Sequence, residues 1–360
     1  MVSTAQTELR PAWDRLQHVD LIGSVVMQVL KGTGLTMRDV DFVINCGSDV
    51  LDGRSISNCG FLGAMGAHHK EESRVEEDGL WGVVYATTKL RSGPAKVGLV
   101  VAYSKPSESD VSAYYSTLCE PFYQRPIGLN HRVASGLAAR EYLQTSDATQ
   151  DDLARAAAAD WARAGTNPWL ELDEVPDADS IAAGPMVASP LREHQVSRPV
   201  DGAVAVLFAT EDVARRVTPT PIWVTGLGTS TDSQMLTERK PGEFEAGAAA
   251  ASQAYRSAGM TAPAFDVAEV SARSIAEELM VVEALGLAER GRASELYGEQ
   301  SPIEINPSGG ALPADPIMAT GLVRLSEARR ALLARSAGRA VVHGSGGIGM
   351  QSHCVITVEV

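Results

Sequence analysis

Hydrophobic residues along the chain follow two patterns, a helical spacing and short continuous runs. Leu21, Val25 and Val29 recur at the spacing of one helix face, which predicts an amphipathic helix near the N-terminus. The runs VGLVVAY (residues 97–103) and AVVH (residues 340–343) are short, rich in β-branched residues and flanked by helical segments. Such runs are typical of strands covered by helices on both faces, so the pattern predicts an α/β layered fold.

The change from helix to strand occurs twice, in two segments of similar sequence. KGTGLTMRDVDFV (residues 31–43) aligns without a gap on RSAGMTAPAFDVA (residues 256–268), so that Gly34 matches Gly259. A helical pattern precedes each segment, and the glycine is expected to end that helix. Both segments then lead into an apolar strand. The repetition predicts two related halves.

A second pair of segments follows the first pair in the same order. LRSGPAKVGLVVAYS (residues 90–104) resembles ARSAGRAVVHGSG (residues 334–346), and both contain a helix end, a turn of small residues and an apolar strand. Two matched pairs in one order indicate a duplication. We therefore expect a first half over residues 1–104 and a second half over residues 191–360, with residues near 198–212 completing the sheet of the first half.

The segment between the halves, residues 105–190, has a different composition. It contains seven proline residues, an amphipathic helical pattern near residues 130–143 and an Ala-rich helical pattern over residues 150–164. Thr149 stands at the start of the second helix as a capping residue, and the two aspartates that follow favour the positive end of the helix dipole. This segment is expected to form a loop or lid domain.

Composition excludes several classes of function. The net charge of −14 argues against nucleic acid and anionic membrane surfaces as partners. The sequence contains no apolar run of the roughly 20 residues that span a bilayer, and its N-terminus lacks a signal-peptide pattern, so we expect a cytoplasmic protein. The four cysteines are far apart and form no metal-binding spacing; no metal or other cofactor is expected.

An acidic run stands directly before a buried helix. In VEEDGLWGVVYA (residues 75–86), Glu76, Glu77 and Asp78 precede Gly79 and an apolar stretch. Carboxylates at a helix N-terminus stabilise it by about 0.3–1 kcal/mol through the helix dipole. A purely structural role is therefore one interpretation of this run.

Several motifs in this order resemble those of the thiolase superfamily, in the branch of sterol-carrier and lipid-transfer-type thiolases. The stretch FDVAEVSARSIAEELMVVEALGL (residues 265–287) resembles the one that carries the HDCF motif of that branch. NPSGGALPADPIMATG (residues 306–321) resembles the NxxGG and GHPxGxxG loop, and GSGGIGM (residues 344–350) resembles the CxGGGxG loop. The resemblance covers nearly the whole chain. It implies a five-layered αβαβα fold built from two duplicated halves with an inserted loop domain.

The resemblance places the family's catalytic groups on other residue types in this chain. The nucleophilic cysteine falls on Glu76, the HDCF histidine on Ser271, the histidine of the GHP step on Asp315, and the second cysteine on His343. A carboxylate cannot hold an acyl group as a thioester, so ordinary thiolysis is not expected. The resemblance also implies a set of substrate-binding residues, namely Asn306, Gly309, Gly310, Gly346 and Gly347.

Two interpretations of these replacements remain open. In the first they are structural: Glu76 favours a helix N-terminus, Asp315 forms an Asx turn before a proline, and His343 is a hydrogen-bonded buried imidazole. In the second, Glu76, Asp315 and His343 come together as an acid/base set.

Three functions follow from the resemblance. The first function is a non-catalytic subunit that pairs with an active thiolase or with a small zinc-ribbon/OB-fold acyl-CoA-binding protein. The second function is an enzyme with new chemistry on an acyl-CoA, such as a carbon–carbon lyase or condensing enzyme. The third function is a carrier of acyl-CoA or lipid without turnover. A CoA thioester is the expected ligand in each case. We also expect a thiolase-fold dimer, homomeric or heteromeric, with the strand near residues 98–103 at or next to the interface.

Overall fold

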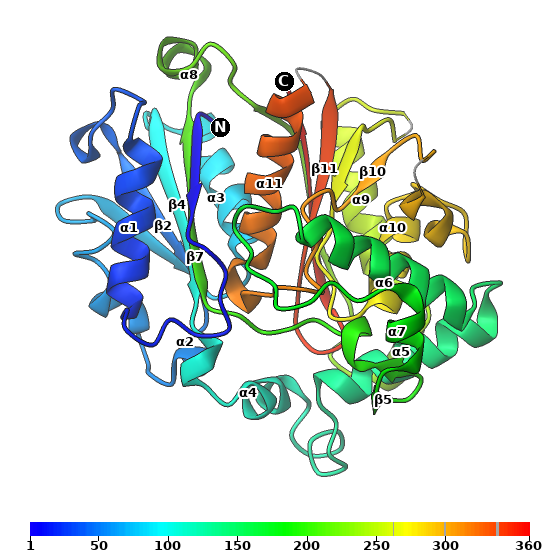
Figure 1. Ribbon diagram of the computed structural model, residues 1–360. Helices are drawn as coiled ribbons and strands as arrows, with labels where there is room; N and C mark the ends of the chain where they lie inside the picture. The colour runs from blue at the N-terminus through cyan, green and yellow to red at the C-terminus, as the bar shows by residue number, and fades with distance from the viewer. Residues whose placement is uncertain (262, 299, 336–337) are drawn as a thin grey trace.

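The structure, a computed structural model, describes residues 1–261, 263–298, 300–335 and 338–360 and contains two five-stranded sheets (Figure 1). The first sheet has the order β1-β7-β4-β2-β3, in which β2, β3 and β4 are parallel and β7 and β1 are antiparallel to their neighbours. Its strands are β1 (Ser3–Gln6), β2 (Phe42–Cys46), β3 (Glu71–Val75), β4 (Val97–Ser104) and β7 (Gly202–Ala209).

The second sheet repeats the first one strand for strand. Its order is β10-β9-β11-β12-β8, again with three parallel strands followed by two antiparallel ones. Its strands are β8 (Trp223–Thr231), β9 (Val267–Glu269), β10 (Glu304–Ile305), β11 (Arg339–Gly346) and β12 (Ser352–Glu359). Strand β2 corresponds to β9 and β4 to β11, the two pairs that the sequence repeats predicted.

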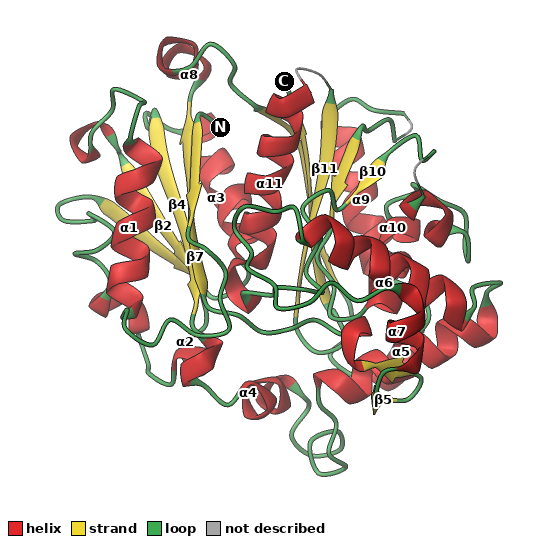
Figure 2. Cartoon of the chain, in the orientation of Figure 1, coloured by secondary structure: helices red, strands yellow, loops and turns green. Residues whose placement is uncertain are grey.

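Helices separate and cover the two sheets, which gives five layers (Figure 2). Helix α1 (His18–Leu30) packs on the outer face of the first sheet, and α9 (Glu245–Ser257) packs on the outer face of the second. Helices α3 (Gly79–Ser92) and α11 (Thr320–Arg335) contact each other between the sheets. The prediction of a five-layered αβαβα fold from two duplicated halves is confirmed.

The repeated segments explain how each half turns from helix to strand. A glycine with positive φ follows each helix: Gly34, at 72°, lies four residues after the end of α1, and Gly259, at 69°, lies two residues after the end of α9. Glycine adopts this conformation without the steric penalty of a side chain. Three residues of the sequence repeats, Ala262, Ser336 and Ala337, lie outside the described residues.

One expectation about the first sheet is wrong. The apolar strand near residues 98–103 was expected at or next to the interface of an edge-to-edge dimer, but β4 is the central strand of the sheet and lies between β2 and β7. Its apolar character reflects burial between helices on both faces. The edges of this sheet are β1 and β3, so an edge-to-edge dimer would have to use one of those strands.

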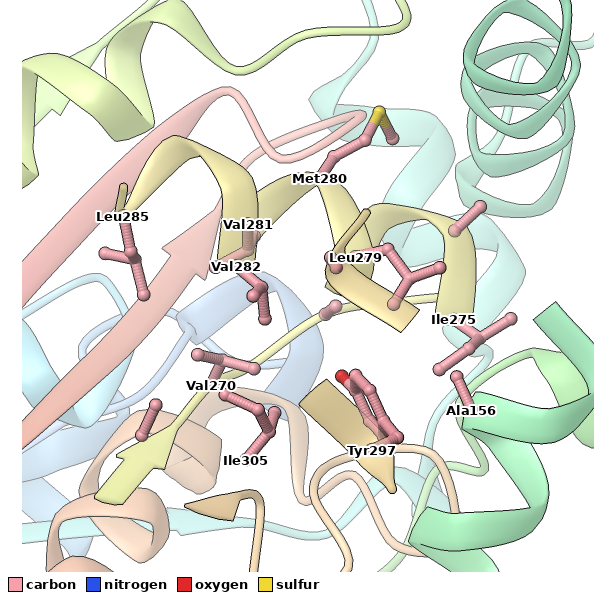
Figure 3. Packing of buried hydrophobic residues seen from close by; sticks show 14 of the residues in the cluster. Ala156, Val270, Ile275, Leu279, Met280, Val281, Val282, Leu285, Tyr297 and Ile305 are labelled. Carbon is pink, nitrogen blue, oxygen red and sulfur yellow. The ribbon is translucent and has the colours of Figure 1, made fainter. Parts of the chain in front are cut away.

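The segment between the halves packs against the second half. Its helices α5 and α6 contact α10 (Ile275–Ala284), and Trp161 of α6 is fully buried in the resulting core. Figure 3 shows this core, in which side chains of α10 meet Val270, Tyr297 and Ile305. The remaining helices and strands are α2 (Asp49–Asp52), α4 (Val111–Leu118), α5 (His131–Thr145), α6 (Gln150–Ala164), α7 (Ala178–Ala183), α8 (Glu211–Val217), β5 (Met186–Ala188) and β6 (Leu191–Arg192).

A helix that crosses a bilayer must be both long and apolar. Within the described ranges, no helix meets both conditions.

Candidate active site

The acidic run ends in the cap of the central helix α3. Asp78 is the N-cap residue, and its side chain is almost fully buried. Its Oδ1 accepts a hydrogen bond from the backbone N–H of Leu80 (2.9 Å), and its Oδ2 accepts one from Gly321 (2.8 Å), in the first turn of α11. Burial raises the pKa of Asp78 to about 7, although the two N–H donors oppose the shift. One carboxylate thus joins the central helices of the two halves.

Glycines of the second half make room for these carboxylates. A Cβ on Gly321 would lie 2.1 Å from Asp78 Oδ1, and a Cβ on Gly346 would lie 1.4 Å from Glu77 Oε1. Both distances are far below any real carbon–oxygen contact. The two acidic side chains therefore occupy space that any residue other than glycine would fill.

Glu77 is the acidic side chain that enters a cavity. Its Oε1 accepts a hydrogen bond from Ser352 Oγ (3.1 Å), at the start of β12. Burial raises the pKa of Glu77, while the bond from Ser352 and the charge of Arg273 act in the opposite direction. The carboxyl group is therefore more readily protonated than an ordinary glutamate.

The cavity has a volume of about 590 Å³ and lies where the two halves and the intervening segment meet. Its lining combines acidic groups, aromatic side chains of α3 and α4, and residues of the loop between β11 and β12. Its lining residues include Glu76, Glu77, Trp81, Tyr114, Tyr115, Gln234, Arg273, Met318, Gly346, Gly347 and Ser352. The volume is in the range of ordinary small-molecule sites.

Arg273 is the one cation among the described residues that line this cavity. Its Nη1 donates to Asp315 Oδ2 (2.6 Å), and its guanidinium carbon lies 5.5 Å from the centre of the Tyr115 ring. Burial alone would lower the pKa of Arg273, but the charge of Asp315, its hydrogen bond and the neighbouring Tyr115 together raise the pKa above its ordinary value. Arg273 is thus charged and held in a fixed position beside the cavity.

Asp315 lies behind Arg273 and does not line the cavity. Besides the guanidinium, its carboxylate accepts hydrogen bonds from Ser197 Oγ (2.9 Å) and Thr320 Oγ1 (2.6 Å). The acid is fully engaged with these three donors. Its geometry is that of an ion-pair partner of Arg273 rather than of a group that meets a ligand.

His343 lies inside the second sheet, away from the cavity lining. Its Nε2 is 2.9 Å from Nδ1 of His353, and both imidazoles are fully buried. Burial, and then the neighbouring His353, hold the pKa of His343 well below its usual range. Ser271 is also buried and does not reach the cavity lining.

The loop with Asn306, Gly309 and Gly310 has a supporting role. Asn306 Oδ1 accepts a hydrogen bond from the backbone N–H of Val270 (2.8 Å), which fixes the segment that leads to Arg273. A Cβ on Gly309 would lie 2.5 Å from the Cβ of Ala164 in α6. These three residues are buried and do not line the cavity.

Three of the residues chosen from the sequence do line the cavity: Glu76, Gly346 and Gly347. Glu76 also lines the cavity, and its side chain is half exposed. Its carboxylate accepts hydrogen bonds from Arg74 Nε (3.1 Å) and from the backbone N–H of Asp49. The acid/base set expected from Glu76, Asp315 and His343 is not assembled, because only Glu76 reaches the cavity.

Sequence reasoning missed the residues that give the cavity its chemistry. Glu77 is the residue next to the chosen Glu76. Which of the two carboxylates becomes buried beside the cavity depends on where the backbone turns into α3. Arg273 is a single cation inside an apolar and acidic stretch, VAEVSARSIAEELM, and that contrast was the available signal. Tyr114 and Tyr115 lie in the proline-rich segment that was interpreted only as a loop domain.

Comparison with known proteins agrees with this architecture. Residues 228–359 match the family described as thiolase C-terminal domain-like. The chain is 24% identical to an acetyl-CoA acetyltransferase of Methanothermobacter thermautotrophicus over 91% of this chain and 88% of that protein. It is 25% identical to human sterol carrier protein 2 over 66% of this chain and 48% of that protein.

A solved structure described as Ltp2-ChsH2(DUF35) aldolase superposes with a TM-score of 0.81 at 20% identity, over 99% of this chain and 96% of that one. The chain described here therefore has the thiolase fold. The resemblance to the thiolase superfamily, in its sterol-carrier branch, is therefore confirmed. Within this thiolase-fold protein the cavity lies at the N-terminus of α3, the position in which active thiolases carry their nucleophile according to the resemblance.

Proposed function

We propose that the protein is a carbon–carbon lyase of the aldolase kind, which cleaves a 3-hydroxyacyl-CoA thioester, and that it works with a small zinc-ribbon/OB-fold acyl-CoA-binding protein. The observation that carries the proposal is Glu77, a carboxyl group whose pKa is raised by burial and which lines the same cavity of about 590 Å³ as Arg273. The similarity in fold to a structure described as an aldolase supports it.

The reaction requires a base, a stabiliser of negative charge, and no redox partner. The base removes the proton of the 3-hydroxyl group, the bond between C2 and C3 breaks, and C3 becomes a carbonyl carbon. The electron pair of that bond passes to the thioester as an enolate, which then takes a proton at C2. Glu77 fits the role of the base, and afterwards of the acid that protonates C2, because its pKa is shifted toward neutral pH.

Thiolysis lacks its nucleophile in this cavity. None of the four cysteines is among the lining residues, and Cys46, Cys119 and Cys354 are buried. Burial raises the pKa of Cys46 and of Cys354, which disfavours a reactive thiolate. The same cavity therefore favours chemistry that needs a carboxylate base over chemistry that needs a thiolate.

The proposed partner contacts the loop that follows α4. Phe122, Tyr123 and Ile127 are 79%, 73% and 80% exposed, which is unusual for three large apolar side chains in one short loop. The loop is held from within: the Glu120 carboxylate accepts from the backbone N–H groups that follow it, and the Arg125 guanidinium donates to backbone carbonyls of α4 and its end. A rigid loop with exposed aromatic side chains is a favourable protein contact, because little freedom is lost on binding.

Charge also favours a second chain. CoA carries several phosphate charges, whereas the cavity lining offers one guanidinium, already paired with Asp315, and two carboxylates. Phosphates bind where Arg or Lys side chains are free to donate. A partner that supplies such side chains next to the α4 loop would complete the site for the nucleotide part of the substrate.

The test combines turnover with association. The chain is co-expressed with a candidate zinc-ribbon/OB-fold acyl-CoA-binding protein and offered a series of 3-hydroxyacyl-CoA thioesters. The shorter acyl-CoA product is measured by chromatography. We expect cleavage by the complex and at least a hundredfold slower cleavage by Glu77→Gln. Acyl-CoA binding without cleavage of any member of the series would favour the carrier, and assembly with an intact thiolase without cleavage would favour the non-catalytic subunit.

The contact surface has its own variant. Phe122→Ser, Tyr123→Ser and Ile127→Ser together should leave the melting temperature unchanged, since the side chains have little buried surface, but should abolish co-elution with the partner. Undiminished co-elution would refute the placement of the partner on this loop.

A further inference from the structure

The ion pair between Arg273 and Asp315 has a geometry that suits a charge developing in the cavity. The guanidinium lines the cavity, and the carboxylate that fixes it lies outside the lining. Resting on the proposed function, we propose that Arg273 binds the thioester carbonyl oxygen and stabilises the enolate formed there, and that Asp315 is the positioning residue that orients Arg273. The pair also restricts the substrate to acyl groups without a negative charge.

The guanidinium is fixed from two directions. Asp315 Oδ2 receives Arg273 Nη1 at 2.6 Å and Ser197 Oγ at 2.9 Å. The backbone carbonyl of Arg273 accepts from the backbone N–H of Ser197 (2.8 Å). Both partners of the ion pair are therefore tied to the same segment, and the guanidinium cannot turn without breaking its hydrogen bond to Asp315.

The backbone of Asp315 is held equally firmly. Its N–H donates to the carbonyl of Arg198 (2.8 Å), and its carbonyl accepts from the N–H of Val200 (3.1 Å). Such fixed donors are effective in catalysis because they need no reorganisation when charge develops.

Donors remain on Arg273 for a ligand. A guanidinium carries five N–H groups, and Asp315 takes the one described hydrogen bond that Arg273 donates through its side chain. The guanidinium carbon lies 5.5 Å from the centre of the Tyr115 ring, and this ring limits the movement of the guanidinium on that side. The remaining N–H groups belong to a side chain that borders the cavity, where a carbonyl oxygen can accept from them.

The charge balance favours the enolate over the neutral thioester. Asp315 neutralises Arg273 in the empty site, so a neutral thioester enters without a strong change in electrostatic energy. When the enolate forms, the nearby guanidinium gains an anionic partner, and this gain exists only along the reaction. The arrangement therefore lowers the barrier more than it tightens substrate binding.

The same balance opposes an anionic acyl group. Glu76 and Glu77 line the cavity, and Asp315 pairs with the guanidinium of Arg273, so the cavity and its immediate support contain three carboxylic acids and one lining cation. An additional permanent carboxylate on the substrate would have no free cation to pair with. The aromatic rings of Trp81 and Tyr114 offer an apolar wall instead.

The experiment measures enolate formation directly, with propionyl-CoA as the probe in deuterated buffer. An enzyme that stabilises the enolate exchanges the two C2 protons for deuterium, and mass spectrometry follows the exchange without knowledge of the carbonyl product. Asp315→Asn should slow exchange at saturation by about 100-fold, the effect of a lost oxyanion donor, while the KM for propionyl-CoA changes less than threefold. Arg273→Gln should abolish exchange.

The control is a second buried ion pair in the same half. Arg324 Nη1 lies 3.0 Å from Glu269 Oε2, and neither residue lines the cavity. Glu269→Gln disturbs the fold in a comparable way but should leave exchange per folded molecule unchanged. Ser197→Ala removes only one of the bonds to Asp315 and serves if the other variants do not fold. It should slow exchange several-fold at constant KM.

The outcomes separate this inference from the proposed function. If the wild-type complex neither exchanges propionyl-CoA nor cleaves a hydroxyacyl-CoA, both are wrong. If it exchanges or cleaves but Asp315→Asn and Ser197→Ala lower only the melting temperature, the ion pair is structural and the inference alone is wrong. Efficient cleavage of a substrate with a terminal carboxylate near C3 would refute the restriction to uncharged acyl groups.

Discussion

Replacement of Gly346 by alanine perturbs the packing that holds Glu77 in the cavity. The added Cβ would lie 1.4 Å from Glu77 Oε1, and Cβ contacts below 3.0 Å are essentially never seen. The carboxylate must therefore move by at least 3.0 − 1.4 = 1.6 Å, unless the strand itself shifts. Ser352 Oγ, at 2.8 Å from the same position, must also adjust, and its hydrogen bond to Glu77 would be lost.

The size of the effect follows from this displacement. A misplacement of about 1 Å at a catalytic group can lower a rate by about 100-fold. Extra volume in a packed region typically lowers the free energy of unfolding by about 1–3 kcal/mol. We therefore expect Gly346→Ala to fold, to melt at a lower temperature, and to cleave hydroxyacyl-CoA at least about 100 times more slowly at saturation.

The assay is a double-mutant cycle with Glu77→Ala, read by chemical denaturation and by turnover. Because Glu77→Ala removes the atom that collides, Gly346→Ala should destabilise that variant much less than the wild type. Gly93→Ala, with its nearest neighbour at 3.5 Å, is the matched control and should leave both measurements unchanged. Equal destabilisation by Gly346→Ala in both backgrounds, or full activity of the single variant, would refute the packing described for Glu77.

Three further predictions concern the same site. Ser352→Ala removes a hydrogen bond that lowers the pKa of Glu77, so the pH at which cleavage reaches half its maximum should rise; an unchanged pH profile would exclude Glu77 as the titrating base. Burial raises the pKa of Asp78 to about 7, so its protonated form is favoured in the folded protein. The resulting stabilisation is complete below the unfolded pKa near 3.8 and is progressively lost as the pH rises through 7. In urea denaturation the stability of the wild type relative to Asp78→Asn should thus fall by about 2–3 kcal/mol between pH 5 and pH 8, and a pH-independent difference would contradict the burial of its proton. Incubation with a labelled acyl-CoA should leave no covalent adduct, and mass spectrometry that found one acyl group on any cysteine would overturn the assignment of a non-thiolase chemistry.

The fold was predictable because the duplication is written in short local signals. A helix end, a glycine with positive φ and an apolar strand recur at residues 31–43 and 256–268, and the structure places β2 and β9 at equivalent positions. Strand order was harder to predict. An apolar strand such as β4 looks the same from the sequence whether it is central or at an edge, because the run records burial and not which strands lie beside it.

The candidate site was only partly predictable, since its chemistry depends on one-residue differences in backbone geometry. The resemblance chose Glu76, but the N-cap position of Asp78 turns Glu77 toward the cavity and leaves Glu76 at the rim. Asp315 was chosen as a catalytic group, whereas its carboxylate faces the side chain of Arg273 from a segment 42 positions away in the chain. Contacts between such distant residues are set by packing, and no local pattern in either segment contains them.

The most direct test of the account is cleavage of 3-hydroxyacyl-CoA thioesters by the complex, with wild type and Glu77→Gln compared as folded proteins of equal melting temperature. The account predicts release of a shorter acyl-CoA and a carbonyl compound in equal amounts by the wild type, and a rate at least about 100-fold lower with Glu77→Gln, as expected for loss of a general base. Cleavage at the same rate in both proteins would contradict it.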